Sequence, residues 1–135
     1  MHPTKFTLMR ADLSLSEVGQ GDCEAAIAAF GATPWADLLA QIPALLQANK
    51  DCIDPNLTFT AEKVHLTISA KRAGEFHVEV CVPRVKKFLG IFGGVKFYTF
   101  SPIGSEKAEH VIRSFMTDTP EAQHEVYSQL SRVAA

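Results

Sequence analysis

The sequence has no long hydrophobic run and few cysteines, and both shortages exclude classes of protein. No apolar stretch approaches the roughly 20 residues that cross a membrane as a helix. Residues 1–14 lack the apolar core of a signal peptide. The three cysteines, Cys23, Cys52 and Cys81, are an odd number without CxxC spacing. We therefore expect reduced thiols and a cytoplasmic location.

Motifs for nucleotides and metals are also lacking. Residues 90–94 contain three glycines but match neither GxGxxG nor GxxxxGK[ST]. His110 and His124 do not stand in HExxH spacing. We expect no cofactor and no bound metal, and the lack of a convincing nucleophile or base argues against an enzyme.

The net charge is only −2, but it is distributed unevenly. Residues 63–96 carry seven bases against two acids, a net charge of +5, and the rest carries six bases against thirteen acids, a net charge of −7. The basic region either attracts the acidic flanks within one fold or meets an anionic partner. A nucleic-acid partner is disfavoured because the whole chain, with a pI near 6.2, is acidic.

The strongest pattern in the sequence is a β-hairpin from Val64 to Val82. Even positions are apolar on both arms and odd positions are mostly polar, which is typical of half-buried strands. Residues that face each other across a sheet share one face, so even positions must pair with even positions. A three-residue loop at 72–74 satisfies this rule, with Gly74 in a left-handed conformation and Lys71 opposite Glu75.

The flanking segments predict helices. Thr33-Pro34 is a typical helix start, and it precedes an apolar stripe at helical spacing: Trp35, Leu38, Leu39, Ile42, Leu45 and Leu46. Because the stripe continues in phase through Pro43, we expect one kinked helix from Pro34 to Ala48, with two short helices as the alternative.

Two further helices are expected after the hairpin. The first begins at Ser105 and buries Ala108, Val111, Ile112, Phe115 and Met116. The second begins at Thr119-Pro120, with an apolar line formed by Ala122, Val126, Leu130 and Val133. The predicted fold is one α+β domain over residues 1–135, with an antiparallel three- to four-stranded meander packed against N-terminal and C-terminal helices.

The segment Arg84–Gly94 is the predicted partner-binding surface, because it mixes bases with aromatic side chains in a loop. Its candidate contact residues are Arg84, Lys86, Lys87, Phe88 and Phe92. The alternative is that the apolar side chains of this loop fold back and cover the core. The first interpretation predicts a non-enzymatic binding module that acts through protein–protein contact or self-association, including a homodimer.

A small-ligand-binding protein or an enzyme is the alternative function. Its pocket is expected between the sheet and the helices, lined by His65, His77, Glu79 or Tyr98. His65 is also predicted to lie opposite Cys81 on the polar face of the hairpin. Zinc ligation or a Cys–His pair is conceivable there, but a solvated polar face is the expected state.

Overall fold

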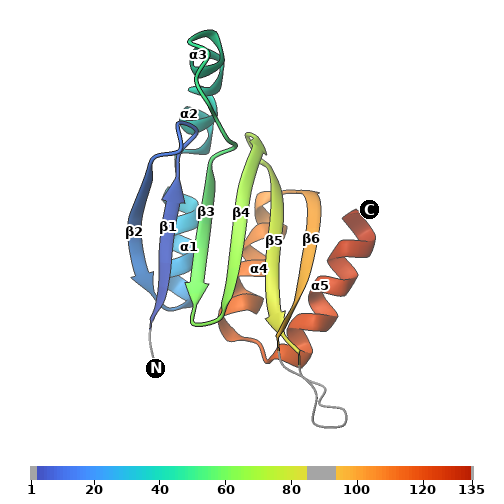
Figure 1. The fold of residues 1–135 in the computed structure, drawn as a ribbon. Coiled ribbons are helices and arrows are strands. Elements are labelled where there is room, and N and C mark those ends of the chain that lie inside the picture. The colour runs from blue at the N-terminus through green and yellow to red at the C-terminus, as the bar shows by residue number, and fades with distance from the viewer. Residues whose placement is uncertain (1–2, 85–93, 135) are drawn as a thin grey trace.

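The computed structural model describes residues 3–84 and 94–134. Within them, the chain forms six strands and five helices (Figure 1). In chain order these are β1 (Thr4–Met9), β2 (Leu15–Gly21), α1 (Cys23–Ala32), α2 (Trp35–Leu39), α3 (Ile42–Gln47), β3 (Asn56–Ala61), β4 (Val64–Arg72), β5 (Glu75–Pro83), β6 (Val95–Ile103), α4 (Ser105–Thr117) and α5 (Pro120–Ala134).

The strands form one antiparallel sheet in the order β2-β1-β3-β4-β5-β6. The α+β class with an antiparallel sheet is confirmed, but the prediction of three to four strands is wrong because the described residues contain six. One of the strands beyond this count is β2, which has no apolar alternation and holds Gly19 and Gly21. Its pairing with β1 includes an irregularity between Phe6 and Thr7, which leaves Val18 as an extra residue.

The predicted hairpin register is confirmed over most of its length. Leu66 pairs with Val80 and Ile68 with Val78, and all four side chains are fully buried. Gly74 has a φ of +80°, as the turn requires. The expected three-residue loop and the pairing of Lys71 with Glu75 are wrong. The register shifts between Ala70 and Arg72 and places Arg72 opposite Glu75, so the loop holds only Ala73 and Gly74.

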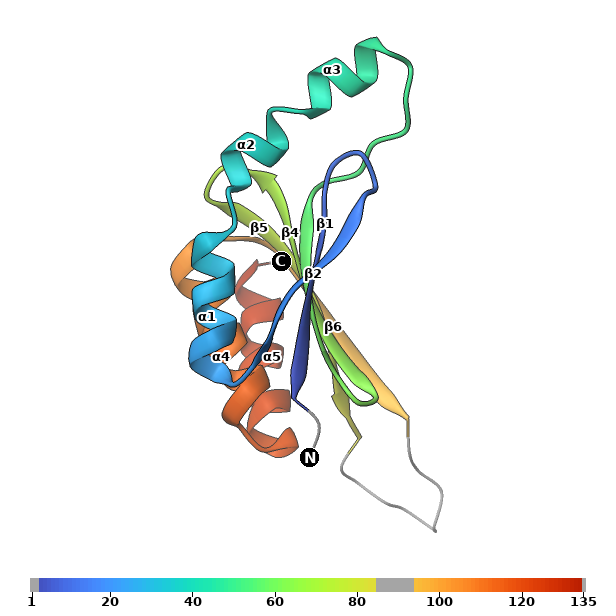
Figure 2. The same ribbon diagram turned by 90° about the vertical axis from the view of Figure 1, so that its left-hand side faces the viewer.

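The helices α1, α4 and α5 lie on one face of the sheet (Figure 2). One hydrophobic cluster fills the space between them and the even positions of β4 and β5. The stripe predicted for α4 is confirmed at Ala108, Val111, Ile112 and Phe115, which are buried, whereas Met116 is only half-buried. Each large side chain in this layer contributes roughly 1.5–3 kcal/mol by leaving water.

The last helix is rotated relative to the predicted apolar line. Over residues 120–132 its buried residues are Gln123 and Tyr127, while Ala122, Val126 and Leu130 are only half-buried. The side chain of Val133, the fourth residue of the predicted line, lies outside the described part. The Gln123 Nε2 donates to the carbonyls of Ser114, Phe115 and Asp118 at 3.0–3.3 Å. These carbonyls lie at the end of α4, where the last acceptors of a helix need partners from elsewhere, although the Ser114 carbonyl also accepts from Asp118 N–H. A buried glutamine can therefore take the place of an apolar residue.

The predicted kinked helix from Pro34 to Ala48 is two helices, as the alternative had it. Pro43 lies at the start of α3, where the missing N–H of proline does not break a helical hydrogen bond. No helix in the described residues is long and apolar enough to cross a membrane.

Candidate interaction surface

Residues 34–55, which we call the arm, leave the helical layer and extend past the end of the sheet (Figure 2). The first half of the arm is anchored to the body. The Trp35 ring lies 5.4 Å from the Phe76 ring and 5.9 Å from the Phe30 ring, centroid to centroid. Leu38 is buried beside them. Aromatic contacts of this kind fix α2 firmly on the core.

The second half of the arm is not covered by the body. We call α3 the arm tip. Five of its six residues are apolar, and none of the six is buried. Leu46 is 62% exposed, and Ile42 and Leu45 are only half-buried. A hollow of about 400 Å³ lies beside α3, lined by Asp12, Gln41, Ala44, Leu45, Ala48 and Lys50. The arm tip therefore presents apolar surface to water instead of to the core.

The chain returns from the arm tip through a well-held segment. Ile53 N–H donates to the Ala11 carbonyl at 3.0 Å, and Ala70 N–H donates to the Pro55 carbonyl at 2.9 Å. Lys71 Nζ lies 3.0 Å from Asp54 Oδ2, although both side chains are well exposed and such a pair adds little stability. Both ends of the arm are thus attached to the body, and only its tip stands free.

Other exposed apolar side chains gather at the same end of the molecule. The described residues contain six large exposed hydrophobic side chains, namely Leu13, Leu15, Val18, Leu46, Ile53 and Phe97. Leu46 and Ile53 belong to the arm, Leu13 belongs to the adjoining β1–β2 turn, and Leu15 is the first residue of β2 after that turn. Scattered exposed leucines are normal on a protein surface, but a cluster of them marks an interaction site.

The predicted partner-binding loop lies mostly outside the described residues. Lys86, Lys87, Phe88 and Phe92 all fall in the segment 85–93, so their contacts stay a prediction. Arg84 is exposed, and its backbone N–H donates to the Gly94 carbonyl at 3.2 Å. This hydrogen bond joins the two ends of the loop.

The four residues predicted to line a ligand pocket lie on opposite faces of the sheet. His65, His77 and Glu79 are on the face away from the helices, and Tyr98 is buried on the covered face. None of the four lines the cavity beside α1, which is described below. The structure therefore does not bring Tyr98 together with the other three.

Tyr98 belongs to a polar contact that sequence reasoning missed. Its hydroxyl lies 2.8 Å from His124 Nδ1, and His124 Nε2 lies 2.9 Å from the Pro83 carbonyl oxygen. A carbonyl only accepts, so Nε2 carries a hydrogen and donates it to Pro83. The contact joins α5 to β5 and β6, and residues that lie 26 positions apart give no local sequence signal for it.

His65 and Cys81 are neighbours, as predicted. The His65 backbone N–H donates to Cys81 Sγ at 3.1 Å, and the sulfur lies 3.6 Å from His65 Nδ1. The thiol is almost fully buried, whereas reactive cysteines are partly exposed. Among the described residues, no three metal-ligating side chains gather at one point. This pair therefore has the features of a packing contact.

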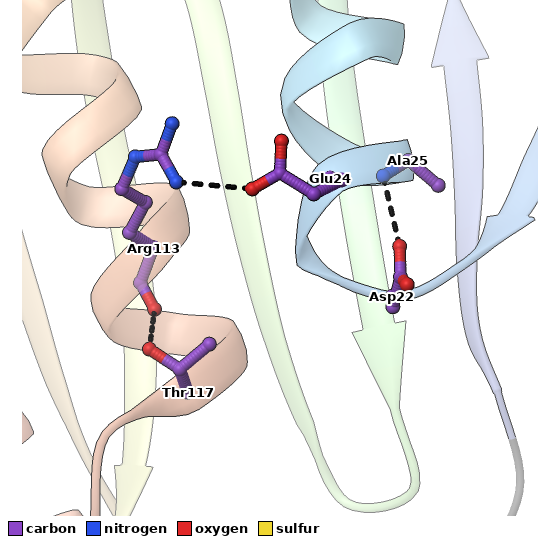
Figure 3. Close-up of polar contacts among 5 residues, drawn as sticks. All are labelled: Asp22, Glu24, Ala25, Arg113 and Thr117. Atoms are coloured by element: carbon purple, nitrogen blue, oxygen red, sulfur yellow. Dashed lines mark hydrogen bonds and ion pairs between the residues drawn. The ribbon is translucent and has the colours of Figure 1, made fainter.

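A cavity of about 500 Å³ opens between the start of α1 and the end of α4. Figure 3 shows its polar contacts: the Asp22 carboxylate accepts from Ala25 N–H at 3.0 Å, and Arg113 Nη1 donates to Glu24 at 3.3 Å. Burial raises the pKa of the Cys23 thiol, although Arg113 opposes this shift, so the thiol stays protonated at neutral pH. The helix start is already capped by an acid, and the cavity lacks an activated nucleophile.

Comparison with protein-family models, curated proteins and solved structures found no match.

Proposed function

We propose that this protein is a non-enzymatic binding module that contacts another protein chain, either a different protein or a second copy, through the arm tip. The observation that carries the proposal is the apolar helix α3, which has no buried residue although α2, directly before it, is anchored in the core.

The energetic cost of this exposure supports the proposal. Covering a leucine or isoleucine side chain gains about 1.5–3 kcal/mol. In the isolated chain, much of this gain is lost because Ile42, Leu45 and Leu46 stay exposed or only half-buried. The apolar stripe that begins at Trp35 is therefore exposed to water at this end. A docked protein chain recovers it, because helices with an exposed apolar face bind by placing residues at positions i, i+3 and i+4 against a partner.

The small-ligand alternative has weaker support. The cavity beside α1 is bordered by Asp22 and Glu24, and its one thiol is protonated at neutral pH. His65, His77 and Glu79 lie on the open face of the sheet, where a polar surface is ordinary.

The test places a photo-activated cross-linking amino acid at Leu46 in the full chain. A matched control places the same group at Lys107, which is exposed on α4. After irradiation in an extract of the source cell, we expect the Leu46 probe to capture a polypeptide and the Lys107 probe to capture none. Equal capture at both positions, or no capture at Leu46, would contradict the proposal.

A further inference from the structure

We infer that the chain contacted by the arm tip is a second copy of this protein, held antiparallel to the first across a two-fold axis. The inference rests on the proposed function and names the partner of the same surface. It follows from the charges that flank the arm tip, from the symmetry of its apolar residues, and from its position beyond the sheet.

The flanking charges favour an antiparallel pairing of two copies. The arm tip itself carries no charge. Asp37 lies six residues before Pro43, and Lys50 lies six residues after Ala44. Both are exposed, and neither forms an ion pair among the described residues. An antiparallel pair of arms places Asp37 of one copy near Lys50 of the other at both ends, whereas a parallel pair opposes like charges.

The same two-fold axis pairs the apolar residues. An axis that passes between Pro43 and Ala44 places Ile42 of one copy opposite Leu45 of the other. Each such contact occurs twice, because the same surface is used on both copies. Such an interface is closed, so it predicts a dimer and excludes a growing filament.

The position of the arm allows the contact without a clash between bodies. α3 lies past the end of the sheet, away from α1, α4 and α5 (Figure 2).

The arm tip is a helix of six residues, so two tips bury much less than the roughly 800 Å² per partner of a standard interface. Leu13 on the adjoining turn and Leu15 at the start of β2 enlarge the contact. Asp51 follows Lys50 and weakens the charge attraction, so the apolar residues supply the affinity and the charges set the orientation. We expect a weak dimer.

Sedimentation equilibrium of the full chain tests the inference. The wild-type protein is expected to pass from monomer to dimer between about 5 and 500 µM, where small interfaces dissociate. Leu46→Glu is expected to weaken the dimer by roughly 100-fold, since the change occurs twice in the interface. Gln47→Glu is the matched control, because it adds the same charge to the same helix away from the apolar stripe, and we expect a change below about threefold.

Charge exchange tests the orientation. Asp37→Lys and Lys50→Asp are each expected to weaken the dimer by about tenfold, and the double variant is expected to return to within about threefold of wild type. Melting curves of all variants control for unfolding. A wild-type protein that stays monomeric, equal effects of Leu46→Glu and Gln47→Glu, or no recovery in the double variant would overturn the inference.

The two proposals fail in different ways. A monomeric wild type whose Leu46 probe captures a different polypeptide contradicts the second copy and leaves the binding module intact. A monomeric wild type whose Leu46 probe captures nothing contradicts both.

Discussion

The arm helix α3 and the body helix α4 both carry apolar side chains at helical spacing, yet their burial is opposite. Five residues of α4 are buried, and no residue of α3 is. The difference arises from position, since α4 lies over the sheet and α3 extends beyond its end (Figure 2). The spacing of apolar residues indicates which side of a helix needs cover, and the fold decides whether the same chain provides it.

Truncation of a core residue and of an arm-tip residue is expected to give the largest contrast. Phe76→Ala should reduce the free energy of unfolding by about 3–5 kcal/mol, because Phe76 is buried against Phe30 and Trp35. Leu46→Ala should change it by less than about 0.5 kcal/mol at a concentration where the protein is monomeric. Denaturant unfolding measures both. A comparable loss in the two variants would show that the arm tip is part of the core.

A substitution in the turn between β4 and β5 is expected to give a smaller loss of stability. Gly74→Val should destabilise the protein by about 1 kcal/mol or more, because a β-branched residue resists the positive φ of 80° at this position. No atom lies within 4 Å of an added Cβ, so the effect isolates backbone strain. An unchanged denaturant midpoint would show that the turn adopts another conformation.

The packing of α5 predicts that the free energy of unfolding depends on pH, by about as much as Gly74→Val changes it. Tyr127 is fully buried, and burial raises the pKa of its hydroxyl above the ordinary value of about 10. The folded state therefore holds this proton more tightly than the unfolded state. The resulting stabilisation is complete below about pH 10 and decreases as the pH rises further.

Unfolding at pH 9 and pH 11 measures this effect. The wild type should lose roughly 1 kcal/mol more than Tyr127→Phe between the two values, because the variant has no hydroxyl to ionise. Equal losses in the two proteins would mean that Tyr127 titrates normally and that the interior around α5 is open to water.

The smallest effect on stability is expected in the loop between β5 and β6. If Phe88 and Phe92 form a contact surface, Phe88→Ala and Phe92→Ala should leave the melting temperature nearly unchanged and reduce association. If they cover the core, each change should cost about 3–5 kcal/mol. Melting curves distinguish the two, and a large loss would leave the arm tip as the remaining candidate contact surface.

The sequence predicted the parts of the fold that have strong local patterns. The alternation at Leu66 and Val80 determined the hairpin register, and the start of α5 was found from its capping residue Thr119, whose hydroxyl accepts from Ala122 N–H. The start of α4 was found, but Ser105 does not cap it, because the N-cap is Gly104 and has no side chain to accept a hydrogen bond. The strand β2 was missed because its pairing depends on β1 and not on its own apolar pattern. The bulge that leaves Lys71 without a partner on β5 was also missed, because it depends on the conformation of the whole turn and not on the apolar alternation.

The candidate site was predictable only in part. The stripe from Trp35 to Leu46 was visible in the sequence, but its division into a covered half and an uncovered half depends on where the sheet ends. The order of the strands sets this boundary, and contacts between distant residues set that order. The placement of Tyr98 against His124 was hidden for the same reason.

Hydrogen exchange of the arm-tip amides as a function of protein concentration tests the central claim most directly. The N–H groups of Leu45 and Ala48 donate to the carbonyls of Gln41 and Ala44 in α3 and its caps, and no residue of this helix is buried. We predict fast exchange in dilute protein and slower exchange as the concentration rises, with no change in α4. Exchange in α3 that is as slow as in α4 at the lowest concentration, or that is independent of concentration, would contradict an arm tip that is free in one copy and covered by a second.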